Sequence, residues 1–86
     1  MAKEKSMKER LARYVGKWDL QPASYQIRNP DGTEGGWVPQ VRVLEITTDA
    51  LTVRPIMEKN VVVCDSKEEA NSRALLIGLL WLENNA

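Results

Sequence analysis

The stretch that most constrains the fold is the C-terminal segment of residues 66–83, SKEEANSRALLIGLLWLE. Ser66 and Glu69 stand at the spacing of a capping box, in which two side chains satisfy free backbone N–H groups of the first helical turn. Asn84 offers an end, because Asn tolerates the left-handed conformation that closes helices. The sequence therefore predicts a C-terminal helix over residues 66–83.

The apolar residues of this helix cover more of its circumference than one buried stripe requires. Four residues form a stripe at helical spacing: Ala70, Ala74, Ile77 and Trp81. Five leucines extend the apolar surface most of the way round: Leu75, Leu76, Leu79, Leu80 and Leu82. A surface helix needs only one such stripe, so we expect a second side to meet another part of the chain or another molecule. Leu76, Leu79 and Leu80 are therefore candidate partner contacts.

Length and composition favour one soluble domain spanning residues 1–86. The single cysteine, Cys64, excludes an internal disulfide and fits a reducing compartment. No apolar segment follows the N-terminal lysines, so we expect no signal peptide and a cytoplasmic location. The apolar run of residues 75–82 is much shorter than the roughly 20 residues of a membrane span, so no membrane partner is expected.

Charge is unevenly distributed although the chain is neutral overall. The first 17 residues hold six basic side chains against two acidic ones. A basic arm on an acidic body can contact nucleic acid. The candidate contacts are Lys8, Arg10, Arg13 and Lys17. The alternative is an ordinary solvated helix face beside a solubilising tail.

The N-terminal region predicts one further helix. Residues 1–5 are expected to be disordered, and Ser6 with Glu9 repeats the capping-box spacing. Apolar residues then fall on one face as far as Trp18, and Gly16 weakens the end, so the helix is predicted over residues 6–17. Residues 20–22 are predicted to be a linker, because Pro22 disfavours helix before it.

Residues 23–64 predict an antiparallel sheet. Residues 23–28 alternate like a half-buried strand, and residues 29–32, NPDG, form a strong turn signal. Residues 37–47 predict the longest strand, whose alternation changes phase; a bulge near Val43 or burial on both faces would explain the change. Residues 51–54 predict a third strand that either lies at an edge or breaks at Pro55, because Pro55 cannot donate to a ladder. Residues 61–64 predict a short fourth strand or a continuation of the third.

These elements predict an α+β fold of order α-β-β-β(-β)-α. The antiparallel sheet has three or four strands, and the C-terminal helix packs on one face. The N-terminal helix is expected beside it or on a second protomer.

This order resembles the topology of the double-stranded-RNA-binding domain. In that family the contacts come from the first helix, a Gly-Pro-x-His loop and a lysine-rich start of the last helix. Here the loop is PDGTEGGW and the helix begins SKEEANS, so both RNA-facing motifs are absent. Residues 65–70 are also similar to the helix start that follows the sheet in HicB-type antitoxins, although the Pro-Asp-x-Pro-Gly segment is missing. Neither resemblance assigns functional residues to this chain.

Residue types exclude the commonest chemistries. The chain has no histidine, which removes the usual general base and the usual zinc ligand set. Cys64 follows three valines and is predicted to be a small buried residue. The acidic residues Asp31, Glu34 and Asp65 are explained by turns and caps. We therefore predict no catalytic residue, no metal site and no cofactor.

The sequence thus favours a non-enzymatic interaction protein that self-associates through apolar helix surface or binds another protein. Nucleic-acid binding by the basic N-terminal helix is the alternative. Trp37, a large aromatic residue beside glycines, is a further candidate partner contact, although it can equally plug the sheet against the C-terminal helix.

Overall fold

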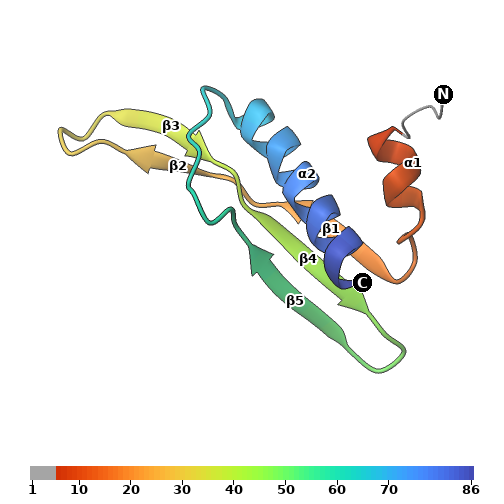
Figure 1. The fold of residues 1–86 in the computed structure, drawn as a ribbon. Coiled ribbons are helices and arrows are strands. Elements are labelled where there is room, and N and C mark those ends of the chain that lie inside the picture. The colour runs from red at the N-terminus through yellow and green to blue at the C-terminus, as the bar shows by residue number, and fades with distance from the viewer. Residues whose placement is uncertain (1–5) are drawn as a thin grey trace.

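A computed structural model describes residues 6–86 of the chain. Two helices flank five strands, in the order α1 (Met7–Ala12), β1 (Trp18–Pro22), β2 (Tyr25–Arg28), β3 (Glu34–Val38), β4 (Val41–Ile46), β5 (Leu51–Ile56) and α2 (Lys67–Asn85). Figure 1 shows α2 lying along the sheet with α1 beside it. Residues 1–5, which were predicted to be disordered, lie outside the described residues.

The strands form two antiparallel sheets, one of order β1-β4-β5 and one that pairs β2 with β3. Pro22 pairs with Val41, and Tyr25 pairs with Val38. The three-residue step from Pro22 to Tyr25 is matched by an equal step from Val41 back to Val38. The pairing therefore keeps the same register from one sheet into the other. The two sheets are one ribbon of two long strands that bends where β1 passes into β2 and β3 into β4.

The bent ribbon gives the molecule an extended shape. Its β2–β3 end projects beyond the layer in which α2 covers β1 and β4 (Figure 1). The radius of gyration is 14.8 Å, whereas a compact domain of this length has a value of about 12 Å. Counted as two bent strands and β5, the chain follows the predicted order of helix, three strands and helix, and the α+β class with an antiparallel sheet under the C-terminal helix is confirmed.

The core lies between β4 and α2. Val41 and Val43 are fully buried and pack against Ala74 and Leu82 of the helix. Gly78 allows the helix to approach closely, because a Cβ atom at this position would lie 2.8 Å from Leu20 Cδ2. Small residues on one face of α2 thus set its distance from the sheet, as the stripe in the sequence indicated.

Helix α2 begins as predicted. The Ser66 hydroxyl accepts a hydrogen bond from the Glu69 backbone N–H at 3.1 Å, and the Glu69 carboxylate accepts from the Asp65 N–H at 3.3 Å. The Glu69 carboxylate of the capping box therefore accepts from the backbone N–H of Asp65 rather than from that of Ser66. Together with the acidic first turn, these contacts fix the helix start through local interactions alone.

The N-terminal helix is shorter than predicted, and the linker prediction is wrong. Helix α1 ends at Ala12, and turns follow to Lys17, with Gly16 at a φ of +92° that favours glycine. Residues 20–22 belong to β1 rather than to a linker. Pro22 is compatible with this strand because β1 lies at an edge of the sheet and Pro22 is its last residue.

Two predictions about the sheet are corrected. The strand expected over residues 37–47 is divided at Pro39 and Gln40, and the pairing of β4 with both neighbours runs without a bulge across Val43. The change of phase arises because the buried residues of this central strand change face: Val43, packed against α2, is fully covered, and Leu44, on the opposite face, is 8% exposed. Arg42 and Ile46 of that opposite face are exposed. The expected fourth strand over residues 61–64 is reduced to one bridge between Cys64 and Trp37.

Candidate interaction surface

The leucines of α2 divide into exposed and buried sets. Leu76 and Leu80 are 40% and 45% exposed, whereas Leu79 is fully buried. Leu75 and Leu82 face the α1 side of the helix, where they line a hollow with Leu11. Of the three leucines predicted as partner contacts, Leu76 and Leu80 are therefore available at the surface, and Leu79 belongs to the core.

The exposed leucines border a shallow groove of about 270 Å³ on the side of α2 opposite α1. The groove is lined by Glu58, Arg73, Leu76, Ile77 and Leu80. Arg73 Nε donates to Glu58 Oε1 at 2.5 Å, and Arg73 Nη2 donates to Glu58 Oε2 at 3.0 Å. This ion pair ties the segment after β5 to α2, and its hydrogen bonds raise the pKa of the Arg73 guanidinium. The result is an apolar floor with a charged rim.

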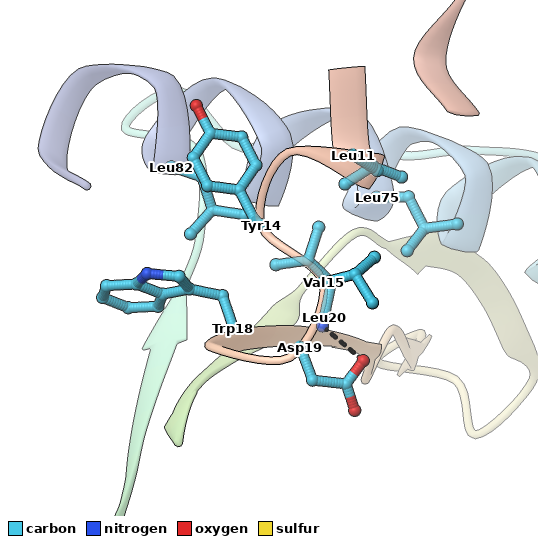
Figure 2. Close-up of a pocket in the computed structure, with 8 residues that line it drawn as sticks. All are labelled: Leu11, Tyr14, Val15, Trp18, Asp19, Leu20, Leu75 and Leu82. Carbon is cyan, nitrogen blue, oxygen red and sulfur yellow. Dashed lines mark hydrogen bonds between the residues drawn. The ribbon is translucent and has the colours of Figure 1, made fainter. Parts of the chain in front are cut away.

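A second hollow, of about 230 Å³, lies between the α1 turn, β1 and the other side of α2 (Figure 2). Its lining is Leu11, Tyr14, Val15, Trp18, Asp19, Leu20, Leu75 and Leu82. Asp19 supplies the only carboxylate of this lining, and that carboxylate accepts a hydrogen bond from the Leu20 N–H at 2.9 Å. The hollow therefore offers apolar contact but no pair of groups suited to acid–base chemistry.

The basic residues of the N-terminal region are partly engaged by acidic groups of α2. Arg10 forms a forked ion pair with Glu83, in which Arg10 Nε lies 2.9 Å from Glu83 Oε2. This hydrogen bonding, with a further contribution from Arg13, lowers the pKa of the Glu83 carboxyl. Arg13 and Lys17 line a hollow with Glu83 and the C-terminal Ala86. Lys8, Arg13 and Lys17 are exposed, so the structure does not form a uniformly positive face from the four predicted residues.

Trp37 is half-buried and joined to the segment that precedes α2. The Trp37 N–H donates to the Cys64 carbonyl at 2.8 Å, and the Cys64 N–H donates to the Trp37 carbonyl at 2.7 Å. Lys67 Nζ lies 5.9 Å from the centre of the indole ring, within range of a cation–π contact. The half-buried tryptophan thus links the ribbon to the start of α2.

The remaining polar candidates have local structural roles. Asp31 accepts hydrogen bonds from the Thr33 backbone N–H at 3.0 Å and from the Thr33 hydroxyl at 2.6 Å, and these bonds lower the pKa of its carboxyl. Cys64 is 4% exposed, and burial raises the pKa of its thiol. Within residues 6–86, no group of three or more acidic, cysteine or histidine side chains is placed to hold a metal ion. No helix of the same range is long and apolar enough to span a bilayer.

The sequence analysis missed a second exposed apolar surface, on the sheet face opposite α2. It contains Ile46, Leu51 and Val53, which are 44%, 59% and 49% exposed. The signal was present in the change of phase at β4, which places Leu44 and Ile46 on the opposite face from Val43. Neighbouring residues of β5 share this face because Leu44 pairs with Val53 and Ile46 pairs with Leu51.

In comparisons with known proteins, no family model, no curated protein and no solved structure matches this chain.

Proposed function

We propose that the protein is a non-enzymatic interaction protein that self-associates through the exposed side of α2. The observation that carries the proposal is the pair Leu76 and Leu80, which lie one turn apart and are 40% and 45% exposed beside an apolar groove. Aliphatic side chains at this spacing form the contact ridge of packed helices. Burial of each leucine against a partner stabilises the complex by about 1 to 2 kcal/mol.

The test is the mass of the protein in solution, measured by light scattering after size exclusion. We expect twice the chain mass of 9.7 kDa for the wild type at about 100 μM, a concentration suited to micromolar affinity. Leu76→Ser and Leu80→Ser together should give a monomer. Val15→Ser is the matched control, because Val15 is 77% exposed on the α1 side of the molecule and its replacement should leave the mass unchanged. A wild type that stays monomeric contradicts self-association.

Nucleic-acid binding through Lys8, Arg13 and Lys17 is the weaker proposal, because the acidic residue Glu83 lines the same hollow as Arg13 and Lys17. It requires a salt-sensitive contact with phosphates. Titration of labelled protein with a short RNA or DNA duplex at low salt would show backbone-amide shifts confined to residues 6–18. The absence of such shifts removes this alternative.

A further inference from the structure

The outer edge of β5 is an unpaired edge of the main sheet. In the order β1-β4-β5, strand β5 pairs only with β4, and five of its six residues are exposed. Figure 1 shows the strand lying beyond the layer that α2 covers. Such an edge presents backbone donors and acceptors on which another strand can pair.

The hydrogen-bond pattern of the β4–β5 hairpin identifies the outward-facing backbone groups. The Thr47 N–H donates to the Ala50 carbonyl at 2.9 Å, so this pair is hydrogen-bonded. Hydrogen-bonded and non-hydrogen-bonded pairs alternate along an antiparallel ladder. The N–H and C=O groups of Leu51 and Val53, and the C=O of Pro55, therefore point away from β4. The ring of Pro55 thus costs the internal ladder no hydrogen bond.

A contact on the other side of β4 supports this assignment. The Ile46 N–H donates to the Lys17 carbonyl at 2.8 Å, beside β1. The backbone of Ile46 therefore points away from its partner Leu51, as a non-hydrogen-bonded pair requires.

We propose that the partner on this edge is β5 of a second copy, paired antiparallel about a two-fold axis with Val53 opposite Val53. The inference rests on the proposed self-association and specifies its contact. In this register the two Val53 residues exchange backbone hydrogen bonds, and each Leu51 N–H donates to the Pro55 carbonyl of the second copy. A two-fold axis makes the contact self-complementary and closed.

Charge selects this register over its neighbour toward the C-terminal end of β5. A shift that centres the axis on Arg54 sets two arginines directly opposite each other, which is destabilising. Pro55 takes a hydrogen-bonding position in both registers, so its missing N–H removes one bond per copy either way and does not distinguish them. The register centred on Val53 instead places each Arg54 opposite Thr52.

The same register brings opposite charges together on the α2 side of the sheet. Glu45 pairs with Thr52 inside the chain, and Thr52 would stand opposite Arg54 of the second copy. The Cα atoms of Glu45 and that Arg54 are then about 10 Å apart across Thr52, from the ordinary spacings of antiparallel pairs. Glutamate and arginine side chains can span this distance. Within residues 6–86, neither Glu45 nor Arg54 takes part in an ion pair.

Pairing through β5 also accounts for the exposed side of α2. The helix covers β1 and β4, and the groove beside Leu76 and Leu80 opens toward the segment after β5. In the joined sheet, the leucines of both copies lie on one face and look toward each other across the two β5 strands. The two β4 strands, and the α2 helices above them, would be at least about 14 Å apart, so the strand edges make the direct contact and the leucines line a shared groove above the two β5 strands.

The test is site-specific disulfide formation in the full-length chain under mild oxidation. Val53→Cys places two cysteines at a Cα separation of about 5.5 Å in this register, which a disulfide can bridge. We expect a covalent dimer from this variant. Leu51→Cys and Thr52→Cys are matched controls, because both residues are also exposed but would lie too far from their symmetry mates. The wild type controls for Cys64, which is buried.

The outcomes separate this inference from the proposed function. A non-covalent dimer by light scattering, combined with failure of Val53→Cys to cross-link or with cross-linking of a control, overturns the β5 contact and leaves self-association standing. A monomer at about 100 μM overturns both. As a second measurement, Arg54→Glu should raise the dimer Kd about tenfold, and Glu45→Arg combined with Arg54→Glu should restore it. An unchanged Kd in Arg54→Glu contradicts the proposed ion pair and its register.

Discussion

Replacing Leu79 or Leu80 by alanine provides a direct test of how α2 is oriented. The residues are adjacent in the helix and carry the same side chain, so the change in helix propensity is the same for both. Leu79 is fully buried and Leu80 is 45% exposed. Truncation of a buried leucine removes its transfer free energy and leaves a cavity, at a cost of about 2 to 5 kcal/mol. Truncation of Leu80 should cost less than about 1 kcal/mol in the monomer.

The expected difference is large compared with the stability of a domain of this size. A chain of 86 residues has a free energy of unfolding of about 4 to 13 kcal/mol. Leu79→Ala should therefore lower the midpoint of thermal unfolding by more than about 10 °C. If the wild-type free energy of unfolding lies near the lower end of this range, the variant should be unfolded.

The assay is urea unfolding followed by circular dichroism and by tryptophan fluorescence. Measurements at about 1 μM and about 100 μM separate folding from association, because a partner that binds only the folded state makes stability depend on concentration. At the lower concentration, Leu79→Ala should lose most of its stability and Leu80→Ala little. Equal losses in the two variants at that concentration would refute the orientation of α2.

Three further predictions concern local contacts. Glu83→Gln should lower stability at neutral pH, because pairing with Arg10 lowers the folded-state pKa of Glu83. The difference in stability from wild type should persist above the unfolded pKa of about 4.3 and disappear as the pH falls through the folded pKa. A series of thermal midpoints against pH would show this. Gly36→Ala should destabilise the fold by about 1 to 3 kcal/mol, because its Cβ atom would lie 2.3 Å from Val63 Cγ1 and 2.8 Å from the Cys64 carbonyl oxygen; faster amide exchange at Cys64 would accompany the loss, and unchanged exchange would contradict it. The Cys64 thiol should react with a thiol reagent at least about tenfold more slowly in the native protein than in urea, and equal rates would show that it is not buried.

The parts of the fold that depend on local interactions were predictable from the sequence. The start of α2 follows from Ser66 and Glu69, whose hydrogen bonds involve only neighbouring residues. The turn at residues 29–32 follows from its proline and glycine, and Gly32 adopts a φ of +88°. Pro55 indicated an edge strand or a break, because a missing N–H is a property of the residue itself; β5 lies at an edge and continues through Pro55 to Ile56.

The parts that depend on tertiary contacts were not predictable in this way. Trp18 fitted the apolar face of the first helix in the sequence, but it begins β1 and packs edge-to-face on Trp81 with 5.7 Å between ring centres. Helix α1 ends at Ala12, and Gly16, with its positive φ, lies in the turns that separate it from Trp18. Long-range contact with α2 therefore decided between helix and strand at a residue compatible with both.

The exposed side of α2 also depends on tertiary contacts that the sequence does not show. The sequence indicated that α2 has too much apolar circumference for one covered side, but the leucines at positions 76, 79 and 80 are equivalent by residue type. Only the placement of α1 and the sheet distinguishes the covered Leu79 from the exposed Leu76 and Leu80. The apolar face opposite α2 produced a change of phase in the sequence pattern, and that pattern alone left a bulge and burial on both faces as alternatives.

The exposed side of α2 and the bare edge of β5 have a common physical origin. A single helix is about 10 Å across, whereas three strands spaced about 4.8 Å apart form a wider sheet. Helix α1 is six residues long and lies on the α1 side of α2, beside β1, so it cannot cover the opposite margin. Thr52 and Arg54 of β5 therefore remain exposed on the very face that α2 protects over β4. A chain with only these two described helices leaves that margin for another molecule, and a second copy supplies a matching strand edge there.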